Sequence, residues 1–263
     1  MVTSSRSPIE QFHLSGRVAV IIGAGSGIGR CTAELFAAVG TRVVIVDVNR
    51  TAAQTVVDAI AAAGGVAWLS QADISQESEI ESMFSEVVER ERSVDILVNN
   101  AGTAIRRPAI ELSLADWDKV VSINMTGTFL CARTAARHML KDDRGGVIVN
   151  IASIMGLSGG GLYPNISYQA TKGAVVNMTR ALAVEWSRRG VRVNAVAPTW
   201  VDTEFIAGLK AKPELMAEIR RVTPLGRLAQ AHEVASAILF LASPAAAMIT
   251  GHVLPVDGGF LAQ

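Results

Sequence analysis

VAVIIGAGSGIG, residues 18–29, is the stretch of this sequence that decides its fold. A short apolar run, Val18–Ile22, leads into a glycine-rich turn that opens directly into a helical pattern. Glycines let the backbone turn tightly and approach a pyrophosphate, while the N-terminus of the next helix supplies N–H donors and positive potential. The stretch predicts a dinucleotide-binding unit, with an ordinary strand–helix turn as the alternative. The turn residues expected to bind the cofactor are Gly23, Gly25, Ser26, Gly27, Ile28 and Gly29.

The rest of the chain repeats this alternation of short β-branched runs and longer helical patterns. Continuous apolar runs are typical of strands that are buried on both faces, and hence of a parallel sheet with helices on each side. We therefore predict an α/β fold class: a single doubly wound (Rossmann) domain over residues 1–263, with a seven-stranded parallel sheet and helices on both faces. Strands are expected at about 18–22, 43–46, 66–69, 96–98, 147–151, 191–196 and 253–256, and helices at about 28–39, 51–63, 76–91, 114–140, 167–188 and 231–242.

Composition argues against several other classes of protein. Half of the residues are hydrophobic, which excludes disorder. Lys+Arg and Asp+Glu number 24 each, without a basic block, so nothing indicates nucleic acid or an anionic membrane as a partner. The N-terminal segment lacks the apolar run of a signal peptide, and Val234–Leu241 is too short to span a membrane. We expect a cytoplasmic enzyme.

Cysteine and histidine usage gives no sign of a disulfide framework or a metal site. Cys31 and Cys131 both lie in apolar, helix-like segments, which indicates reduced thiols. The histidines lack metal-ligand spacing, so no metal is predicted. They are His13, His138, His232 and His252.

Asp47, at the end of the second strand pattern, is the residue that bears on cofactor choice. A carboxylate there can accept hydrogen bonds from adenosine ribose hydroxyls and repel a 2′-phosphate, so NAD is favoured over NADP. Arg50 lies three residues on and could partly offset the repulsion, although no Lys or Arg occurs at 24–26. The alternative is that Asp47 only caps the strand end.

Tyr168 and Lys172, within SYQATK, are the candidate proton-transfer pair. Residues at i and i+4 lie on one face of a helix, so both side chains can act on one bound molecule. A neighbouring cation favours the phenolate and lowers the tyrosine pKa. The alternative is an exposed helical pair without a catalytic role.

Further polar residues follow the other strand patterns. Asp73 ends the third strand, where it either contacts a ligand or caps the next helix. Asn99–Gly102 forms a turn after the fourth strand, and Ser153 follows the fifth, where its hydroxyl either reaches a substrate carbonyl or serves a turn. Asn124 interrupts an apolar helical pattern and needs buried partners, as a structural staple or as part of a polar relay.

Taken together with the closing Val256–Gly259, these residues resemble the classical short-chain dehydrogenase/reductase family, from about Leu14 to Phe260. The resemblance implies that Tyr168 is the acid/base and that Lys172 holds the nicotinamide ribose and lowers the tyrosine pKa. It implies that Ser153 positions the substrate oxygen and that Asn124 supports a water relay to Lys172. The other implied cofactor contacts are Asp73, Ile74, Asn100, Ala101, Gly102, Tyr168, Pro198, Val201 and Thr203, and the implied assembly is a homotetramer.

The function predicted on this basis is NAD-dependent interconversion of a secondary alcohol and a ketone, on a small-molecule substrate. The stretch from Asn100 to Pro108 and the loop from Pro198 to Thr203 resemble those of polyol and sugar-acid dehydrogenases of the family. The alternative among enzymes is a 3-oxoacyl thioester reductase. The alternative of another class is a non-catalytic, nucleotide-sensing binding protein on the same fold.

Residues 199–228 form the least regular part of the sequence and are expected to be a substrate lid. Trp200 within it either walls the substrate site or packs the core. Arg106 and Arg107, just after the fourth-strand turn, are either solvated charges or contacts for a polar or acidic substrate.

The sequence departs from the family pattern in three places. Ile22 replaces a threonine that ties the glycine turn to its neighbour, so that local order is in question. Thr199 replaces a glycine, with an expected effect on contact with the nicotinamide amide. The segment between Ser153 and Tyr168 is about two residues longer than is common.

Overall fold

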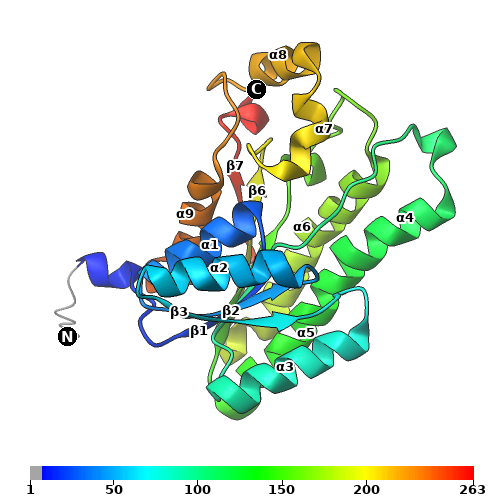
Figure 1. The fold of residues 1–263 in the computed structure, drawn as a ribbon. Coiled ribbons are helices and arrows are strands. Elements are labelled where there is room, and N and C mark those ends of the chain that lie inside the picture. The colour runs from blue at the N-terminus through cyan, green and yellow to red at the C-terminus, as the bar shows by residue number, and fades with distance from the viewer. Residues whose placement is uncertain (1–7) are drawn as a thin grey trace.

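The computed structural model describes residues 8–263 and contains one seven-stranded sheet in which every pair of neighbours is parallel. The strand order is β3-β2-β1-β4-β5-β6-β7, which is the doubly wound order predicted (Figure 1). The strands are β1 Val18–Ile22, β2 Arg42–Asp47, β3 Val66–Gln71, β4 Ile96–Asn99, β5 Gly146–Ile151, β6 Val191–Pro198 and β7 Val253–Val256. Each predicted strand is confirmed to within two residues at either end.

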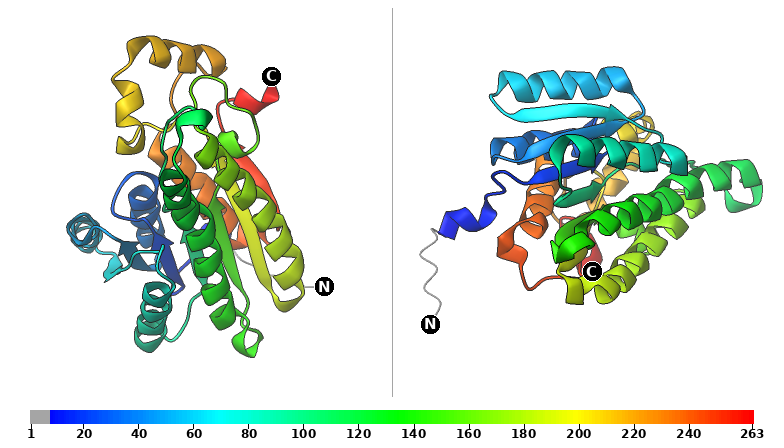
Figure 2. Two further views of the ribbon diagram at one scale, coloured as in Figure 1. Left: turned by 90° about the vertical axis from the view of Figure 1, so that its right-hand side faces the viewer. Right: turned by 90° about the horizontal axis from the view of Figure 1, so that it is seen from below.

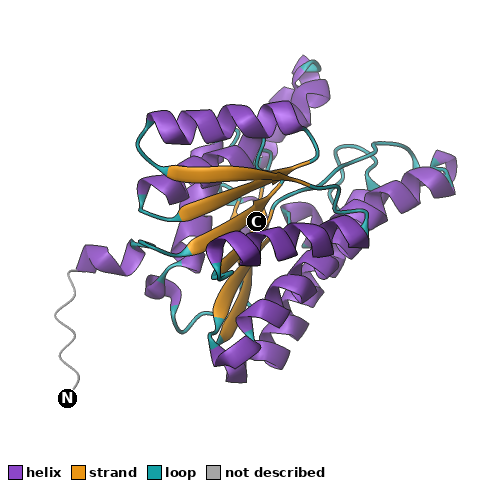
Figure 3. Cartoon of the chain, turned by 60° about the horizontal axis from the view of Figure 1, so that its bottom comes forward, coloured by secondary structure: helices purple, strands orange, loops and turns teal. Residues whose placement is uncertain are grey.

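Helices cover both faces of the sheet (Figure 3). They are α1 Gly27–Ala38, α2 Arg50–Ala62, α3 Glu77–Glu91, α4 Leu114–Val121, α5 Thr128–Met139, α6 Ile166–Trp186, α7 Ala207–Lys210, α8 Pro213–Val222 and α9 Ala231–Ala242. None of the helices in the described part of the chain combines the length and apolar character that a membrane span needs.

Two apolar cores lie on opposite faces of the sheet. Phe36 of α1, Ile60 of α2 and Ile238 of α9 belong to one core. Phe84 of α3 and Cys131 of α5 belong to the other, together with the end of α6. Strand residues alternate between these two cores, which is why the strand sequences are apolar throughout. Figure 2 shows the helices in two layers around the sheet.

The strand order reverses between β1 and β4. Strands β2 and β3 lie on one side of this pair, and β5, β6 and β7 lie on the other. Ligands of such sheets bind in the crevice beyond the carboxyl ends of the strands at this point. The glycine turn follows β1 here, and the Asn99–Gly102 turn follows β4.

The helix predicted over 114–140 is divided into two α-helices, α4 and α5. Between α4 and α5 lies a π-helical turn, Ser122–Gly127, with Asn124 in it. Such wide turns in a helix re-aim a side chain and occur often at functional sites. The turn escaped prediction because its residues fit the apolar helical period.

Residues 199–228 are more regular than predicted. Pro213 is the first helical residue of α8, where its missing N–H costs no hydrogen bond, so it starts a helix there. Together with α7, this helix stands at the end of the molecule beyond the carboxyl ends of the strands (Figure 1).

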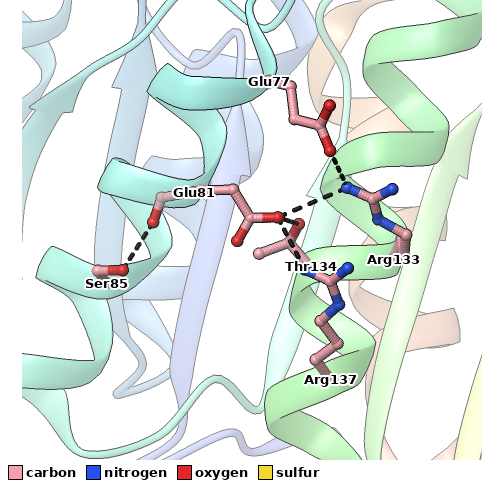
Figure 4. Close-up of polar contacts among 6 residues, drawn as sticks. All are labelled: Glu77, Glu81, Ser85, Arg133, Thr134 and Arg137. Atoms are coloured by element: carbon pink, nitrogen blue, oxygen red, sulfur yellow. Dashed lines mark hydrogen bonds and ion pairs between the residues drawn. The ribbon is translucent and has the colours of Figure 1, made fainter.

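A charged network joins α3 to α5 on the surface (Figure 4). Arg137 donates to the Glu81 carboxylate at 2.8 Å, and the Thr134 hydroxyl donates to the same oxygen at 3.3 Å. Arg133 pairs with both Glu77 and Glu81. These side chains are partly exposed, so each pair contributes at most about 1 kcal/mol. The network helps to dock two helices and lies outside the cleft described next.

Candidate active site

A cleft of about 420 Å³ lies at the carboxyl ends of the strands and brings together residues from across the sequence. The predicted site residues that line it are Gly23, Ser26, Gly27, Ile28, Asp47, Asp73, Ile74, Asn100, Ala101, Gly102, Ser153, Tyr168, Lys172, Pro198, Val201 and Thr203. Gly25, Gly29 and Asn124 are not among its lining residues.

The glycine turn is packed too closely for side chains. Gly23 has φ +73°, and a Cβ there would lie 2.7 Å from the Ala101 Cα. A Cβ on Gly29 would collide with the Gly23 carbonyl oxygen, and one on Gly25 would lie 2.9 Å from an Asp47 carboxylate oxygen. The absence of Cβ atoms therefore brings this backbone close to the β4 turn and leaves a cradle at the start of α1.

Asn100 ties the two turns together. Its amide Nδ2 donates to the Gly23 carbonyl at 2.7 Å, and its backbone N–H donates to the Ile22 carbonyl at 3.2 Å. Ile22 is buried in the apolar core. The Asn100 amide therefore makes a connection between the turns that does not need the threonine hydroxyl absent at Ile22.

Asp47 faces the cleft with its carboxylate held at both oxygens. Gly25 N–H donates to Oδ2 and Asn49 N–H donates to Oδ1, each at 2.9 Å. Two backbone donors fix the orientation of the carboxylate at the edge of the glycine turn. Arg50 is exposed and does not line the cleft within the described part of the chain.

Tyr168 lies at the cleft near the start of α6, opposite Ser153 from the turn after β5. Burial raises the pKa of Tyr168 to about 12, while a hydrogen bond with Ser153 and the positive charge of Arg106 lower it. We predicted a pKa lowered by Lys172, and the structure shows the opposite direction. The phenol carries its proton at neutral pH in this state.

Lys172 has its ammonium 5.5 Å from the centroid of the Tyr168 ring and donates to the Ile151 carbonyl at 2.6 Å. Burial lowers the pKa of Lys172 from 10.5 to about 8. The folded chain thus binds fewer protons than the unfolded chain between these pH values. The charged lysine opposes folding below pH 8 by about 3 kcal/mol, and the penalty fades as pH rises toward 10.5.

Asn124 is fully buried in the π-helical turn, where its amide connects two segments of the chain. Its Oδ1 accepts from the Thr103 N–H at 2.8 Å. Its Nδ2 donates to the Thr103 carbonyl at 2.9 Å and to the Thr171 hydroxyl at 3.2 Å. The amide therefore joins the loop after β4 to helix α6, one residue before Lys172.

Asp73 belongs to a turn that precedes α3 and does not cap that helix. Its Oδ1 accepts from the Ser75 N–H at 2.9 Å, while α3 begins at Glu77 with Gln76 as its cap residue. Asp73 and Ile74 both line the cleft. The structure disfavours the helix-cap alternative for Asp73.

Comparison with known proteins decides the family. A family model described as "Enoyl-(Acyl carrier protein) reductase" matches residues 23–261. The curated relatives include cis-4-hydroxycyclohexanecarboxylate dehydrogenase of Sinomonas cyclohexanicum, 43% identical over 247 residues, which are 94% of this chain and 97% of the relative. The chain belongs to the short-chain dehydrogenase/reductase family. As a family member, it is an oxidoreductase.

Two further relatives show the range of this family. Galactitol 2-dehydrogenase (L-tagatose-forming) of Cereibacter sphaeroides is 42% identical over 252 residues, covering 95% of this chain and 96% of the relative. A 3-oxoacyl-[acyl-carrier-protein] reductase of Synechocystis is 40% identical over 250 residues, covering 94% and 98%.

A solved structure of a family member shares the whole architecture. The gluconate 5-dehydrogenase of Burkholderia cenocepacia, in complex with NADP and tartrate, superposes with a TM-score of 0.93 at 33% identity. The match covers 98% of this chain and 100% of that one.

The residues that line the cleft of this short-chain dehydrogenase/reductase fit a dinucleotide. The glycine cradle fits a pyrophosphate, and the oriented Asp47 carboxylate fits ribose hydroxyls. Thr199, which we noted only as a departure from the family pattern, has a buried hydroxyl without a partner in the described chain. This hydroxyl lines the cleft beside Pro198 and suits a polar group such as the nicotinamide amide.

Neither Asn165 nor Tyr163 is predicted from the sequence as a site residue. Both line the cleft, from the lengthened segment before Tyr168. Asn165 is buried at the cap position of α6, yet its side chain makes no cap hydrogen bond and its Oδ1 has no partner in the described chain. The available signal for Asn165 was a cap-type residue two positions before Ser167, where SYQATK begins. Within residues 8–263, no group of three or more His, Cys, Asp or Glu side chains could hold a metal ion.

Proposed function

We propose that this protein is a cytoplasmic, NAD-dependent dehydrogenase that interconverts a secondary alcohol and a ketone on a small polyol or sugar-acid type substrate. The observation that carries the proposal is that Ser153, Tyr168 and Lys172 face one cleft together with the glycine cradle and Asp47. The relatives support the class, because they are named as dehydrogenases of a hydroxy acid and of a polyol.

NAD, when bound, supplies the hydride acceptor. In this proposal the Ser153 hydroxyl binds and orients the substrate oxygen, and Tyr168 accepts its proton in oxidation or donates one in reduction. Lys172 holds the nicotinamide ribose. The remaining residues of the predicted cofactor set bind adenine, ribose and phosphates, and Asn124 supports a water relay to Lys172.

A 3-oxoacyl thioester reductase is the second candidate, favoured by the Synechocystis relative and by the description of the family model. The two candidate functions are distinguished by comparing two rates of turnover. One is measured with a panel of polyols and sugar acids and NAD, and the other with acetoacetyl thioesters and reduced cofactor. Change in the nicotinamide absorbance reports on both. Turnover of the thioester alone would favour the second candidate.

We propose further that residues 199–228 are a lid over the substrate. Trp200, Ile206 and Leu209 pack with Ile154 and Met155 beside the cleft, in a cluster separate from the two cores of the sheet. An apolar cover of this kind expels water when it closes. We expect hydrogen exchange in this segment to slow when NADH and a substrate are bound, relative to the free protein. Equal exchange in both states would mean a fixed wall, with Trp200 a packing residue.

The proposed assembly is a homotetramer with two-fold axes. Large apolar side chains are exposed on the helices that cover one face: Leu114 of α4, Phe129 of α5 and Val184 of α6, the last 80% exposed. Exposed apolar positions on helix faces are typical of subunit contacts. We expect light scattering to give a tetramer and Val184→Glu to shift it toward smaller species. A stable monomer at micromolar concentration would exclude this assembly.

A further inference from the structure

Arg106 is a cation in the cleft that forms no ion pair with any residue in the described part of the chain. It lines the same cleft as Ser153 and Tyr168. Its Nε is buried and has no hydrogen-bond partner among the residues that the structure describes, and its Nη2 reaches the Phe205 carbonyl only at 3.5 Å. None of the ion pairs within residues 8–263 includes Arg106. Buried polar N–H groups are normally satisfied, so this guanidinium has donors to spare for a ligand.

Aromatic rings hold the guanidinium beside the proton-transfer residue. Its carbon lies 5.8 Å from the Tyr163 ring centroid and 5.5 Å from that of Phe205. Tyr163 is itself fixed, because the Trp200 indole N–H donates to its hydroxyl at 2.8 Å. The Phe205 ring lies 5.9 Å from the Tyr168 ring. Stacking on aromatic faces leaves the planar edge of the guanidinium available for a ligand.

Arg107 shows what an ordinary surface arginine does in the same loop. Its side chain is 55% exposed and pairs with Asp116 at 3.3 Å. It does not line the cleft. The two neighbouring arginines thus differ in burial, pairing and position, and only Arg106 faces the catalytic side.

The other charges of the cleft do not satisfy Arg106. Among the described lining residues the second cation is Lys172, which is bonded to the Ile151 carbonyl. Asp47 and Asp73 accept from backbone N–H groups at the cofactor end. Glu204 lines the cleft without forming an ion pair with Arg106 among residues 8–263.

We infer that Arg106 is a specificity-determining residue that binds a carboxylate of the substrate, so that hydroxy acids are preferred over neutral alcohols. The inference rests on the proposed function and narrows its substrate class. A planar guanidinium fork matches a planar carboxylate through two parallel hydrogen bonds. A single free cation also balances one carboxylate charge, whereas a phosphate dianion carries about two.

The test compares acids with their isosteric amides: gluconate with gluconamide, and cis-4-hydroxycyclohexanecarboxylate with its carboxamide. With NAD, the unchanged protein is expected to favour at least one acid over its amide in kcat/KM by about 10- to 100-fold, the range of a charge-assisted hydrogen-bonded pair. Arg106→Met should remove most of that preference, mainly through KM, and change the rate with the amide far less. Arg106→Lys should restore part of it, and Arg107→Met should leave the preference unchanged.

Binding without turnover keeps the inference separate from the proposed function. Calorimetry of the same pairs with the NADH-bound protein should show the same preference and the same loss in Arg106→Met. If every amide binds and reacts as well as its acid, the inference is overturned while the dehydrogenase function stands. If acids bind through Arg106 but no alcohol in any panel is oxidised, the proposed function fails and the inference holds.

Discussion

Tyr168→Phe is expected to lower the turnover of alcohol oxidation by about 100- to 10,000-fold, the usual contribution of a positioned acid or base. Phenylalanine keeps the ring, and so keeps the contacts with Phe205 and with the Lys172 ammonium. It lacks the hydroxyl that exchanges the substrate proton beside Ser153. Binding of NAD, measured by fluorescence titration, should change by less than about threefold, because the Tyr168 hydroxyl is one contact among the many of the predicted cofactor set.

If Tyr168 is the acid/base, as proposed, its pKa sets the pH dependence of the reaction. Because burial raises this pKa to about 12, the phenol is protonated at neutral pH and only a small fraction is phenolate. Oxidation requires the phenolate, so kcat/KM for the alcohol should rise with pH through the neutral and alkaline range. Reduction requires the phenol, so its rate should stay level there and fall only at higher pH. Tyr168→Phe should flatten both profiles.

Tyr163→Phe is the matched control, since it removes the other phenol at the cleft. Its hydroxyl accepts from the Trp200 indole, and it supports Arg106 from one side. We expect a much smaller loss of turnover than in Tyr168→Phe. Near-normal turnover in Tyr168→Phe, or an equal loss in both variants, would contradict the assignment of the acid/base.

Cofactor choice is the second large effect. NAD is expected to bind about 10- to 100-fold more tightly than NADP, because hydrogen bonds to a charged group are worth about 1.5–3 kcal/mol and each 1.4 kcal/mol is tenfold. The Asp47 carboxylate, fixed by Gly25 and Asn49, would also repel a 2′-phosphate. Titration of the protein with each cofactor measures the difference in affinity. Asp47→Ala should weaken NAD binding, because the ribose loses its acceptor, and should strengthen NADP binding, because the repulsion of the 2′-phosphate is removed.

Arg50→Ala tests the alternative that Arg50 binds the 2′-phosphate of NADP. Arg50 does not line the cleft within residues 8–263, so its removal should change neither affinity by more than about twofold, as is usual for a surface substitution. The solved gluconate 5-dehydrogenase carries NADP, which makes this comparison informative. A tight NADP complex that weakens in Arg50→Ala would show that Arg50 binds the 2′-phosphate and that the NAD assignment is wrong.

The parts of this molecule that could be predicted from sequence are those fixed by local pattern. The glycine turn after β1 needs its residue types because of backbone geometry alone. Each strand could be recognised from its continuous apolar run, because the strands are buried on both faces of the sheet. The carboxyl ends of parallel strands share one edge of a sheet, so Asp47, Asn100 and Ser153 could be expected to meet there without knowledge of the structure.

What could not be predicted depends on contacts between distant segments. Arg106, Tyr163 and Phe205 come together only when the loop after β4, the segment before α6 and residues 199–228 pack against one another. The direction of the Tyr168 pKa depends on burial, which no i, i+4 pattern reports. The regular structure within residues 199–228 also escaped prediction, because the role of Pro213 at the start of α8 depends on where that helix begins.

Label transfer tests the central claim most directly. Each alcohol of the panel is supplied with deuterium on its carbinol carbon, together with NAD and the protein, and the products are analysed by mass spectrometry and proton NMR. The account predicts that the label leaves the substrate carbon and appears in the reduced cofactor, in step with ketone formation, and that both products form about 100- to 10,000-fold more slowly in Tyr168→Phe. Ketone without labelled NADH, or no product from any secondary alcohol or hydroxy acid in the panel, would contradict it.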